Sequence, residues 1–194
     1  MNERIFMVKS EIRKEYQQLR NRYSVAEALE IQQLVNQQIH HWQITTPQSF
    51  LSYQPLLSKR ELSPIALEEK WATAADLPVK CYPKVISATE MVALTIQADT
   101  IYEANVWGIQ EPLNAAVFPP GQLKAMIIPL LAFDEKGYRV GYGKGFYDRF
   151  LEKCAPDVLK VGICHFAPVP EIDDIHIYDV PLNYCITPER IYEF

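Results

Sequence analysis

Glycines gather in one short stretch of this sequence. Four of the chain's seven glycines fall within nine residues: Gly137, Gly141, Gly143 and Gly145. Because glycine loses much conformational freedom on folding, such spacing is useful mainly where the backbone takes a positive φ or approaches a ligand closely. Successive backbone N–H groups in such a turn can converge on an anion. The stretch therefore predicts a phosphate-handling loop, with added positive charge from Arg139, Lys144 and Arg149.

The common nucleotide motifs do not match this stretch. A Walker loop needs Gly-x-x-x-x-Gly-Lys-Ser/Thr and a dinucleotide fold needs Gly-x-Gly-x-x-Gly, whereas the last three of these glycines recur at every second residue. A glycine-rich β-turn that carries solvated charges would produce the same alternation. Residue types alone leave both interpretations open.

Two further cations, Lys9 and Arg13, stand four residues apart near the start of the chain. On a helix this spacing places both on one face, where like charges mildly repel each other. A shared anion would relieve that repulsion. The alternative is a solvated helix surface, because charged side chains usually point at water.

Helical periodicity and short apolar runs define the elements that must position these groups. We predict helices over residues 3–22, from a Ser24/Glu27 capping box to Trp42, from Ser63-Pro64 to about Ala75, and over 146–154. Strands are predicted over residues 50–53, 79–85, 91–96, 125–129, 158–164 and 184–187, with a loop region over 107–120. Helices that alternate with continuous apolar strands predict an α/β fold, a three-layer α/β/α sandwich with a mostly parallel sheet. A helix that starts near Gly145 would also aim its partly positive N-terminus at the glycines.

Composition limits the class of protein. With 194 residues, 48% hydrophobic and 22% charged, the chain is expected to form one globular domain over residues 1–194. Its 24 acidic against 19 basic residues offer no electrostatic footprint for nucleic acid, so any anion site must be local. Without a membrane-spanning apolar run, we expect a cytoplasmic monomer that acts on small molecules. The four cysteines, Cys81, Cys154, Cys164 and Cys185, form no Cys-x-x-Cys and are expected to be buried thiols.

One long segment carries a family resemblance: Pro129-Leu-Leu-Ala-Phe-Asp-Glu-Lys-Gly-Tyr-Arg-Val-Gly-Tyr-Gly-Lys-Gly-Phe-Tyr-Asp-Arg149 resembles the signature of the 5-formyltetrahydrofolate cyclo-ligases, also called methenyltetrahydrofolate synthetases. Supporting matches run along the chain, more weakly before Trp107: Lys9, Arg13, Glu61, Pro83, Trp107-Gly-Ile-Gln-Glu-Pro112, Asp179-Val-Pro-Leu182 and Ile186-Thr187. The resemblance implies a fold similar to that of sugar-phosphate isomerases and deaminases. It also implies ATP-dependent cyclisation of 5-formyltetrahydrofolate to 5,10-methenyltetrahydrofolate, with release of ADP and phosphate.

The same resemblance implies roles for individual residues. The implied ATP contacts are Lys9, Arg13, Arg139, Gly141, Tyr142, Gly143, Lys144, Gly145, Phe146 and Tyr147. Lys144 and Arg139 are the expected catalytic cations. The expected folate contacts are Glu61, Tyr142, Phe146 and Trp107. Asp148 and Asp179 match Mg²⁺-binding aspartates, with Asp173 and Asp174 as alternatives to Asp179.

Several positions depart from the family pattern. Leu130 stands where glycine is frequent, Tyr178 replaces a frequent histidine, Asn183 replaces a frequent aspartate, and Phe166-Ala-Pro-Val lacks the usual glutamine. These departures leave the glycine stretch intact and are expected to affect the folate pocket. Two other functions therefore stay open, a non-catalytic folate or nucleotide binder of the same fold and a sugar-phosphate isomerase-like enzyme.

Overall fold

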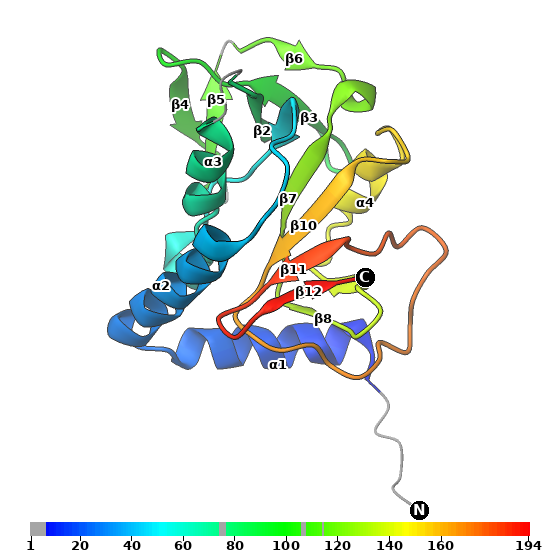
Figure 1. The fold of residues 1–194 in the computed structure, drawn as a ribbon. Helices are drawn as coiled ribbons and strands as arrows, with labels where there is room; N and C mark the ends of the chain where they lie inside the picture. The colour runs from blue at the N-terminus through cyan, green and yellow to red at the C-terminus, as the bar shows by residue number, and fades with distance from the viewer. Residues whose placement is uncertain (1–6, 74–76, 106–107, 114) are drawn as a thin grey trace, which may run out of the picture.

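The core of the molecule is one eight-stranded sheet, seen in a computed structural model that describes residues 7–73, 77–105, 108–113 and 115–194 (Figure 1). Its strands lie in the order β12 (Ile191–Glu193), β11 (Tyr184–Ile186), β10 (Leu159–Ile163), β7 (Ala125–Pro129), β1 (Ser49–Leu51), β2 (Val79–Val85), β3 (Met91–Thr95) and β6 (Val117–Phe118). The five strands from β11 to β2 are parallel, and β12, β3 and β6 pair antiparallel at the two sides. The sheet is therefore mixed and mostly parallel.

The middle strand β7 is buried on both faces. Its side chains alternate between two hydrophobic clusters, with Met126 and Ile128 in one and Ala125 and Ile127 in the other. Because successive side chains of a strand point to opposite faces, a continuous apolar run is the pattern expected of a strand covered on both sides. The sheet thus needs a helical layer on each face.

The helices supply those two layers (Figure 1). Helices α2 (Val25–His41) and α3 (Ile65–Ala72) pack on one face through the cluster that contains Ile127, and α4 (Phe146–Leu151) packs on the other through the cluster that contains Met126. Helix α1 (Lys9–Arg22) lies against a small hairpin of β8 (Ala132–Phe133) and β9 (Arg139–Val140), in a third cluster. The predicted three-layer α/β fold is confirmed.

The predicted capping box of α2 is also confirmed. The Glu27 backbone N–H donates to Ser24 Oγ at 3.2 Å, and the Ser24 backbone N–H donates to the Glu27 carboxylate at 2.7 Å. The N-cap of α3 is Pro64 rather than the predicted Ser63, which lies one residue earlier. The Ser63 hydroxyl still accepts a hydrogen bond from the Ile65 backbone N–H, at 3.4 Å. Gln32 of α2 bonds the backbone N–H and carbonyl of Ser63 at 2.7 Å and 3.2 Å.

Other predicted boundaries are wrong in informative ways. Helix α1 is described from Lys9, and residues 3–6 of the predicted helix lie outside the described residues. Residues 7 and 8 are not helical, contrary to the prediction, and the backbone N–H groups of Met7 and Lys9 donate to Asp173 and Asp174 at 2.6 Å and 2.7 Å. Helix α4 ends at Leu151 rather than Cys154, where the chain tightens into turns. The predicted loop over 107–120 contains strands: β5 (Gln110–Leu113) pairs with the unpredicted β4 (Ile101–Ala104), and β6 joins the main sheet.

Among the described residues, no helix is both long and apolar enough to span a bilayer. Three cysteines are buried as predicted, but Cys154 is only partly buried. Burial raises the pKa of the Cys154 thiol to about 11 and that of Cys164 to about 12, so both remain protonated at neutral pH.

Candidate active site

A cavity of about 510 Å³ opens between α1, the glycine-rich segment and the ends of β2 and β3. The ATP and folate contacts that the family resemblance implies all line it, together with Asp148 and Asp179, apart from Trp107, which lies outside the described residues. Its cationic lining residues are Lys9, Arg13, Lys59, Arg139 and Lys144, and its acidic ones are Glu61, Glu111, Asp148 and Asp179. The chain carries a net charge of −5, so this group of cations makes the cavity the expected local anion site.

Helix α1 presents Lys9, Arg13 and Gln17, spaced by four residues, to the cavity. Arg13 Nε donates to the carbonyl oxygen of Gly141 at 2.8 Å, which ties the helix to the glycine loop. The Lys9 ammonium forms an ion pair with Asp179. The two cations therefore lie on one helix face, as the spacing predicts, and that face lines the cavity rather than a solvated surface.

Three of the glycines line the cavity, and their geometries differ. Gly145 has φ +66°, and a Cβ there would lie 2.7 Å from Arg149 Nη1. Gly143 has φ +88°, and a Cβ there would lie 3.1 Å from Arg13 Cζ. Gly141 has no such φ, and a Cβ on it would meet nothing within 4 Å. Steric demands of the fold explain Gly143, whereas Gly141 leaves an open backbone surface that a ligand can approach.

Gly137 does not belong to the phosphate loop, contrary to the prediction. It lies in the turn between β8 and β9 at φ +84°, where a Cβ would come within 2.7 Å of the Phe194 ring. The residue is needed for the hairpin and for packing of the C-terminus. This hairpin was missed in the sequence because its two-residue strands give no readable alternation.

Both predicted metal ligands are paired with cations. Asp148 accepts a hydrogen bond from Arg139 Nη2 at 2.6 Å, and Asp179 pairs with Lys9. The described part of the chain holds no group of three or more His, Cys, Asp or Glu side chains suited to a metal. Since Mg²⁺ is often held by one or two carboxylates plus substrate phosphates, these residues fit a metal that arrives with a polyphosphate. Asp173 and Asp174 bond the start of α1 instead and do not line the cavity.

Glu61 and Tyr142 form the other polar centre of the cavity. The Tyr142 hydroxyl donates to Glu61 Oε1 at 2.8 Å, and Glu61 Oε2 accepts from the Leu56 backbone N–H at 2.8 Å. Burial, and then the Glu61 charge, raise the pKa of Tyr142, so its hydroxyl keeps its proton. Glu61 is only 9% exposed, which rules out the solvated surface position that its sequence context also allowed.

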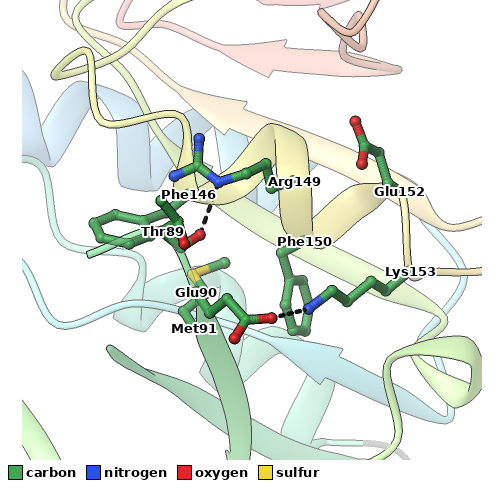
Figure 2. Close-up of a pocket in the computed structure, with 8 residues that line it drawn as sticks. All are labelled: Thr89, Glu90, Met91, Phe146, Arg149, Phe150, Glu152 and Lys153. Atoms are coloured by element: carbon green, nitrogen blue, oxygen red, sulfur yellow. Dashed lines mark hydrogen bonds and ion pairs between the residues drawn. The ribbon is translucent and has the colours of Figure 1, made fainter. Parts of the chain in front are cut away.

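Arg149 does not add charge to the cavity, contrary to the prediction. Figure 2 shows its side chain reaching back from α4 towards Thr89, beside a hollow of about 240 Å³. Arg149 Nε donates to the Thr89 carbonyl and Nη2 to the Lys144 carbonyl, both at 2.7 Å. Lys153 and Glu90 form a second link between α4 and this turn at 2.8 Å. The arginine therefore braces the glycine loop from outside.

The residues that depart from the family pattern do not line the cavity. Leu130 is 2% exposed in the core, and Tyr178 is exposed and stacks on His176 at 5.0 Å. Asn183 accepts a hydrogen bond from the Lys160 backbone N–H at 2.9 Å. None of these three residues, nor Phe166, is among the lining residues. These residues were expected to affect the folate pocket, but none of them contributes to its lining.

Several lining residues had no signal in the sequence. Lys59 Nζ lies 5.1 Å from the centroid of the Tyr142 ring, and Glu111 accepts hydrogen bonds from the Val85 backbone and the Asn105 amide at 3.1 Å and 2.8 Å. The apolar lining, as we call it, includes Pro83, Val85, Met91, Ile109 and Pro129. Pro83, Ile109, Glu111 and Pro129 fall in segments that carry the family resemblance, although no role was predicted for them. Lys59, Val85 and Met91 lie outside those segments, and only the folded structure places them at the cavity.

Comparison with known proteins now identifies the family. The model of the 5-formyltetrahydrofolate cyclo-ligase family matches residues 6–187. The chain belongs to this family. The 5-formyltetrahydrofolate cyclo-ligase of Escherichia coli K12 is 33% identical to this chain, in an alignment that covers 75% of this chain and 79% of that protein. The cyclo-ligase of Mycoplasma pneumoniae is 28% identical, in an alignment that covers 82% of this chain and 86% of that protein.

Solved structures of cyclo-ligase relatives share the fold. The 5,10-methenyltetrahydrofolate synthetase of Mycoplasma pneumoniae superposes with a TM-score of 0.72 at 26% identity, over 94% of this chain and 99% of that one. The synthetase of Aquifex aeolicus gives a TM-score of 0.78 at 26% identity, over 96% and 93%. The predicted family and the predicted fold are both confirmed.

Proposed function

We propose that this chain catalyses the ATP-dependent cyclisation of 5-formyltetrahydrofolate to 5,10-methenyltetrahydrofolate, with release of ADP and phosphate. The observation that carries the proposal is one cavity lined by five cations beside an open glycine backbone and by the hydrogen-bonded pair of buried Glu61 and partly buried Tyr142. The first group suits a polyphosphate and the second suits a ring with N–H donors. Membership of the cyclo-ligase family supports the same pair of substrates.

In the proposed reaction, the formyl oxygen of the folate attacks the γ-phosphorus of ATP, and the bond from that phosphorus to the β,γ-bridging oxygen breaks to release ADP. The folate nitrogen N10 then attacks the activated formyl carbon, and the phosphorylated oxygen departs as inorganic phosphate. The proton of N10 is lost to solvent, which leaves the 5,10-methenyl cation. No covalent bond to the protein forms at any stage.

Phosphoryl transfer of this kind needs mainly alignment and compensation of charge. Lys9 and Arg13 on α1, Arg139 on β9 and Lys144 on the loop all line the cavity, and we assign them to the phosphate oxygens. Lys144 is exposed and has no ion-pair partner in the described part of the chain, so its charge is available to a ligand. Arg139, 6% exposed at its side chain, is held by Asp148 and by the Val180 carbonyl.

The folate side of the cavity is assigned to Glu61, Tyr142 and Phe146, together with the apolar lining. A carboxylate is an acceptor only, so Glu61 can receive the amino and ring N–H groups of a pterin. Trp107 stays a prediction of the sequence for this side. The apolar lining would exclude water from the reacting formyl group.

Magnesium is part of the proposal. Asp148 and Asp179 would hold it together with the phosphate oxygens, and the ion would neutralise charge that develops on the transferred group. Arg139 and Lys9, which are paired with these carboxylates, would be available to the phosphates if the carboxylates held the metal. In the structure, these two ion pairs offset part of the positive charge in the cavity.

The test is direct. Purified protein is mixed with 5-formyltetrahydrofolate and Mg-ATP, methenyl absorbance is followed, and ADP is measured in the same sample. We expect one ADP for each methenyl product. Absence of both products contradicts the proposal. Folate or nucleotide binding without ADP would instead identify a non-catalytic binder, and failure of ATP to bind would favour a sugar-phosphate isomerase-like enzyme.

The cytoplasmic location and monomeric state stay predictions of the sequence. Light scattering coupled to size-exclusion chromatography tests the second. A mass near the 22.4 kDa of the chain agrees with a monomer, and twice that mass contradicts it.

A further inference from the structure

Helix α1 carries a cation that the proposed reaction does not use. Arg20 lies in the last turn of the helix and is only 1% exposed. Its Nη2 donates to the Tyr142 hydroxyl at 2.6 Å, while its buried Nε and Nη1 have no hydrogen-bond partner among the described residues. A buried guanidinium with incomplete hydrogen bonding is costly, so its retention calls for a reason beyond packing.

The hydrogen bond to Tyr142 sets a direction. A guanidinium can only donate, so the Tyr142 oxygen must accept from Arg20 and send its own proton elsewhere. That proton goes to Glu61 Oε1 at 2.8 Å, and Glu61 Oε2 is already bonded by the Leu56 N–H at 2.8 Å. The hydrogen bonds therefore run in one direction, from Arg20 through Tyr142 to Glu61, and end at a carboxylate that lines the cavity.

Arg20 also fixes where the Tyr142 ring lies. Its Cζ is 5.6 Å from the ring centroid, and Lys59 Nζ is 5.1 Å from the same centroid. One helical surface of α1 thus holds two successive residues of the glycine segment, Gly141 through Arg13 at 2.8 Å and Tyr142 through Arg20 at 2.6 Å. The position of the helix and the orientation of the folate-binding pair are coupled by these two arginines.

We propose that Arg20 is a positioning residue for folate recognition. Because Arg20 donates to the Tyr142 oxygen, the Tyr142 hydroxyl donates to Glu61 and keeps that carboxylate oriented. Glu61 can only accept hydrogen bonds, so the site selects a ring edge with N–H donors. The inference rests on the proposed function, since it assigns the folate side of the cavity to Glu61 and Tyr142. Arg20 itself does not line the cavity and is expected to act only through Tyr142.

The experiment compares Arg20→Met with Arg22→Met. Arg22 belongs to the same last turn of α1 and is exposed, so the control removes the same charge from the same helix without touching Tyr142. Loss of one charge-assisted hydrogen bond predicts that the KM for 5-formyltetrahydrofolate rises about tenfold or more in Arg20→Met. The KM for ATP should change less than about twofold, and Arg22→Met should match the wild type in both.

A double-mutant cycle with Tyr142→Phe separates positioning from general stability. If Arg20 acts through the tyrosine hydroxyl, adding Arg20→Met to Tyr142→Phe raises the folate KM by less than about twofold. Arg20→Lys keeps a charged donor and is expected to recover part of the loss, which also serves if Arg20→Met fails to fold. A folate KM in Arg20→Met equal to that of Arg22→Met, or effects that multiply in the double variant, overturns the inference.

Direct binding of 5-formyltetrahydrofolate without ATP, measured by calorimetry on the same proteins, keeps the two proposals distinguishable. If the wild type binds the folate but makes no methenyl product, the proposed function fails while the Arg20 comparison is still decided by the binding constants. If the wild type turns over normally and Arg20→Met binds folate as the control does, only the inference fails.

Discussion

Replacing Gly143 by alanine probes the loop where its geometry is tightest. At φ +88° an alanine pays the left-handed penalty of about 1–2 kcal/mol. The new methyl group would also lie 3.1 Å from Arg13 Cζ and 3.2 Å from Nε, so Arg13 must move. That movement puts at risk the 2.8 Å bond to Gly141, a charged hydrogen bond of about 1.5–3 kcal/mol. Together these effects give roughly 2.5–5 kcal/mol, divided between folding and ATP binding.

Two matched glycines make the experiment specific. Gly141→Ala should leave the melting temperature unchanged, because its Cβ would meet nothing within 4 Å. It should still weaken ATP binding if phosphates come close to that backbone. Gly121→Ala also meets nothing within 4 Å and does not line the cavity, so it should change neither quantity.

The assay pairs thermal unfolding with calorimetric titration of Mg-ATP. For Gly143→Ala we expect a melting temperature lower by about 2–8 °C from the backbone strain and a Kd for ATP raised about tenfold or more. For Gly141→Ala only the Kd should rise. Wild-type ATP affinity in both variants would refute the assignment of this loop to the phosphates, and equal losses in Gly121→Ala would show that the effects are not local.

Three further predictions follow from the same structure. Lys144→Ala should lower kcat/KM about 100-fold or more without changing the melting temperature, because we assign its exposed ammonium to the transferred phosphoryl group. Unchanged steady-state kinetics would count against this role. Asp148→Asn should raise the Mg²⁺ concentration for half-maximal activity about tenfold, measured by titrating the metal at fixed ATP. An unchanged Mg²⁺ requirement would mean that Asp148 serves only as the ion-pair partner of Arg139. Burial, and then the Arg20 charge, lower the pKa of His165 to about 3. Between about pH 6.5 and pH 3, therefore, the imidazole is protonated in the unfolded chain but not in the folded one. The free energy of unfolding should fall by up to about 1.4 kcal/mol for each pH unit in that range as the pH is lowered. Denaturant titrations at several pH values should show a smaller fall in the free energy of unfolding for His165→Gln than for the wild type. An equal fall in both proteins would contradict a buried neutral imidazole.

The elements that the sequence predicted well are those with a strong local pattern. Strand β7 is apolar throughout because both of its faces are covered, and the Ser24/Glu27 pair satisfies the first N–H groups of α2 within four residues of chain. The glycine segment stood out because residues without side chains cluster there against a glycine-poor background. In each case the cause of the structure is local, so the pattern can be read directly.

Features that depend on distant contacts could not be predicted. The backbone N–H groups around the start of α1 donate to Asp173 and Asp174, more than 160 residues away. Arg149 appeared to belong to the phosphate loop by its spacing, yet Thr89 on another turn captures its guanidinium. The local sequence does not distinguish Arg20 from an exposed arginine on a helix, because its partner Tyr142 is brought to it only by folding. The two-residue strands of the β8–β9 hairpin are likewise too short for a periodic signal.

The most direct test of the account is a crystal structure of the protein with a non-hydrolysable ATP analogue and Mg²⁺. We predict that the terminal phosphate oxygens lie within hydrogen-bond distance of backbone N–H groups between Gly141 and Gly145, with Lys9, Arg13, Arg139 and Lys144 around them. An analogue bound elsewhere, with these glycines turned away from the phosphates, would contradict it.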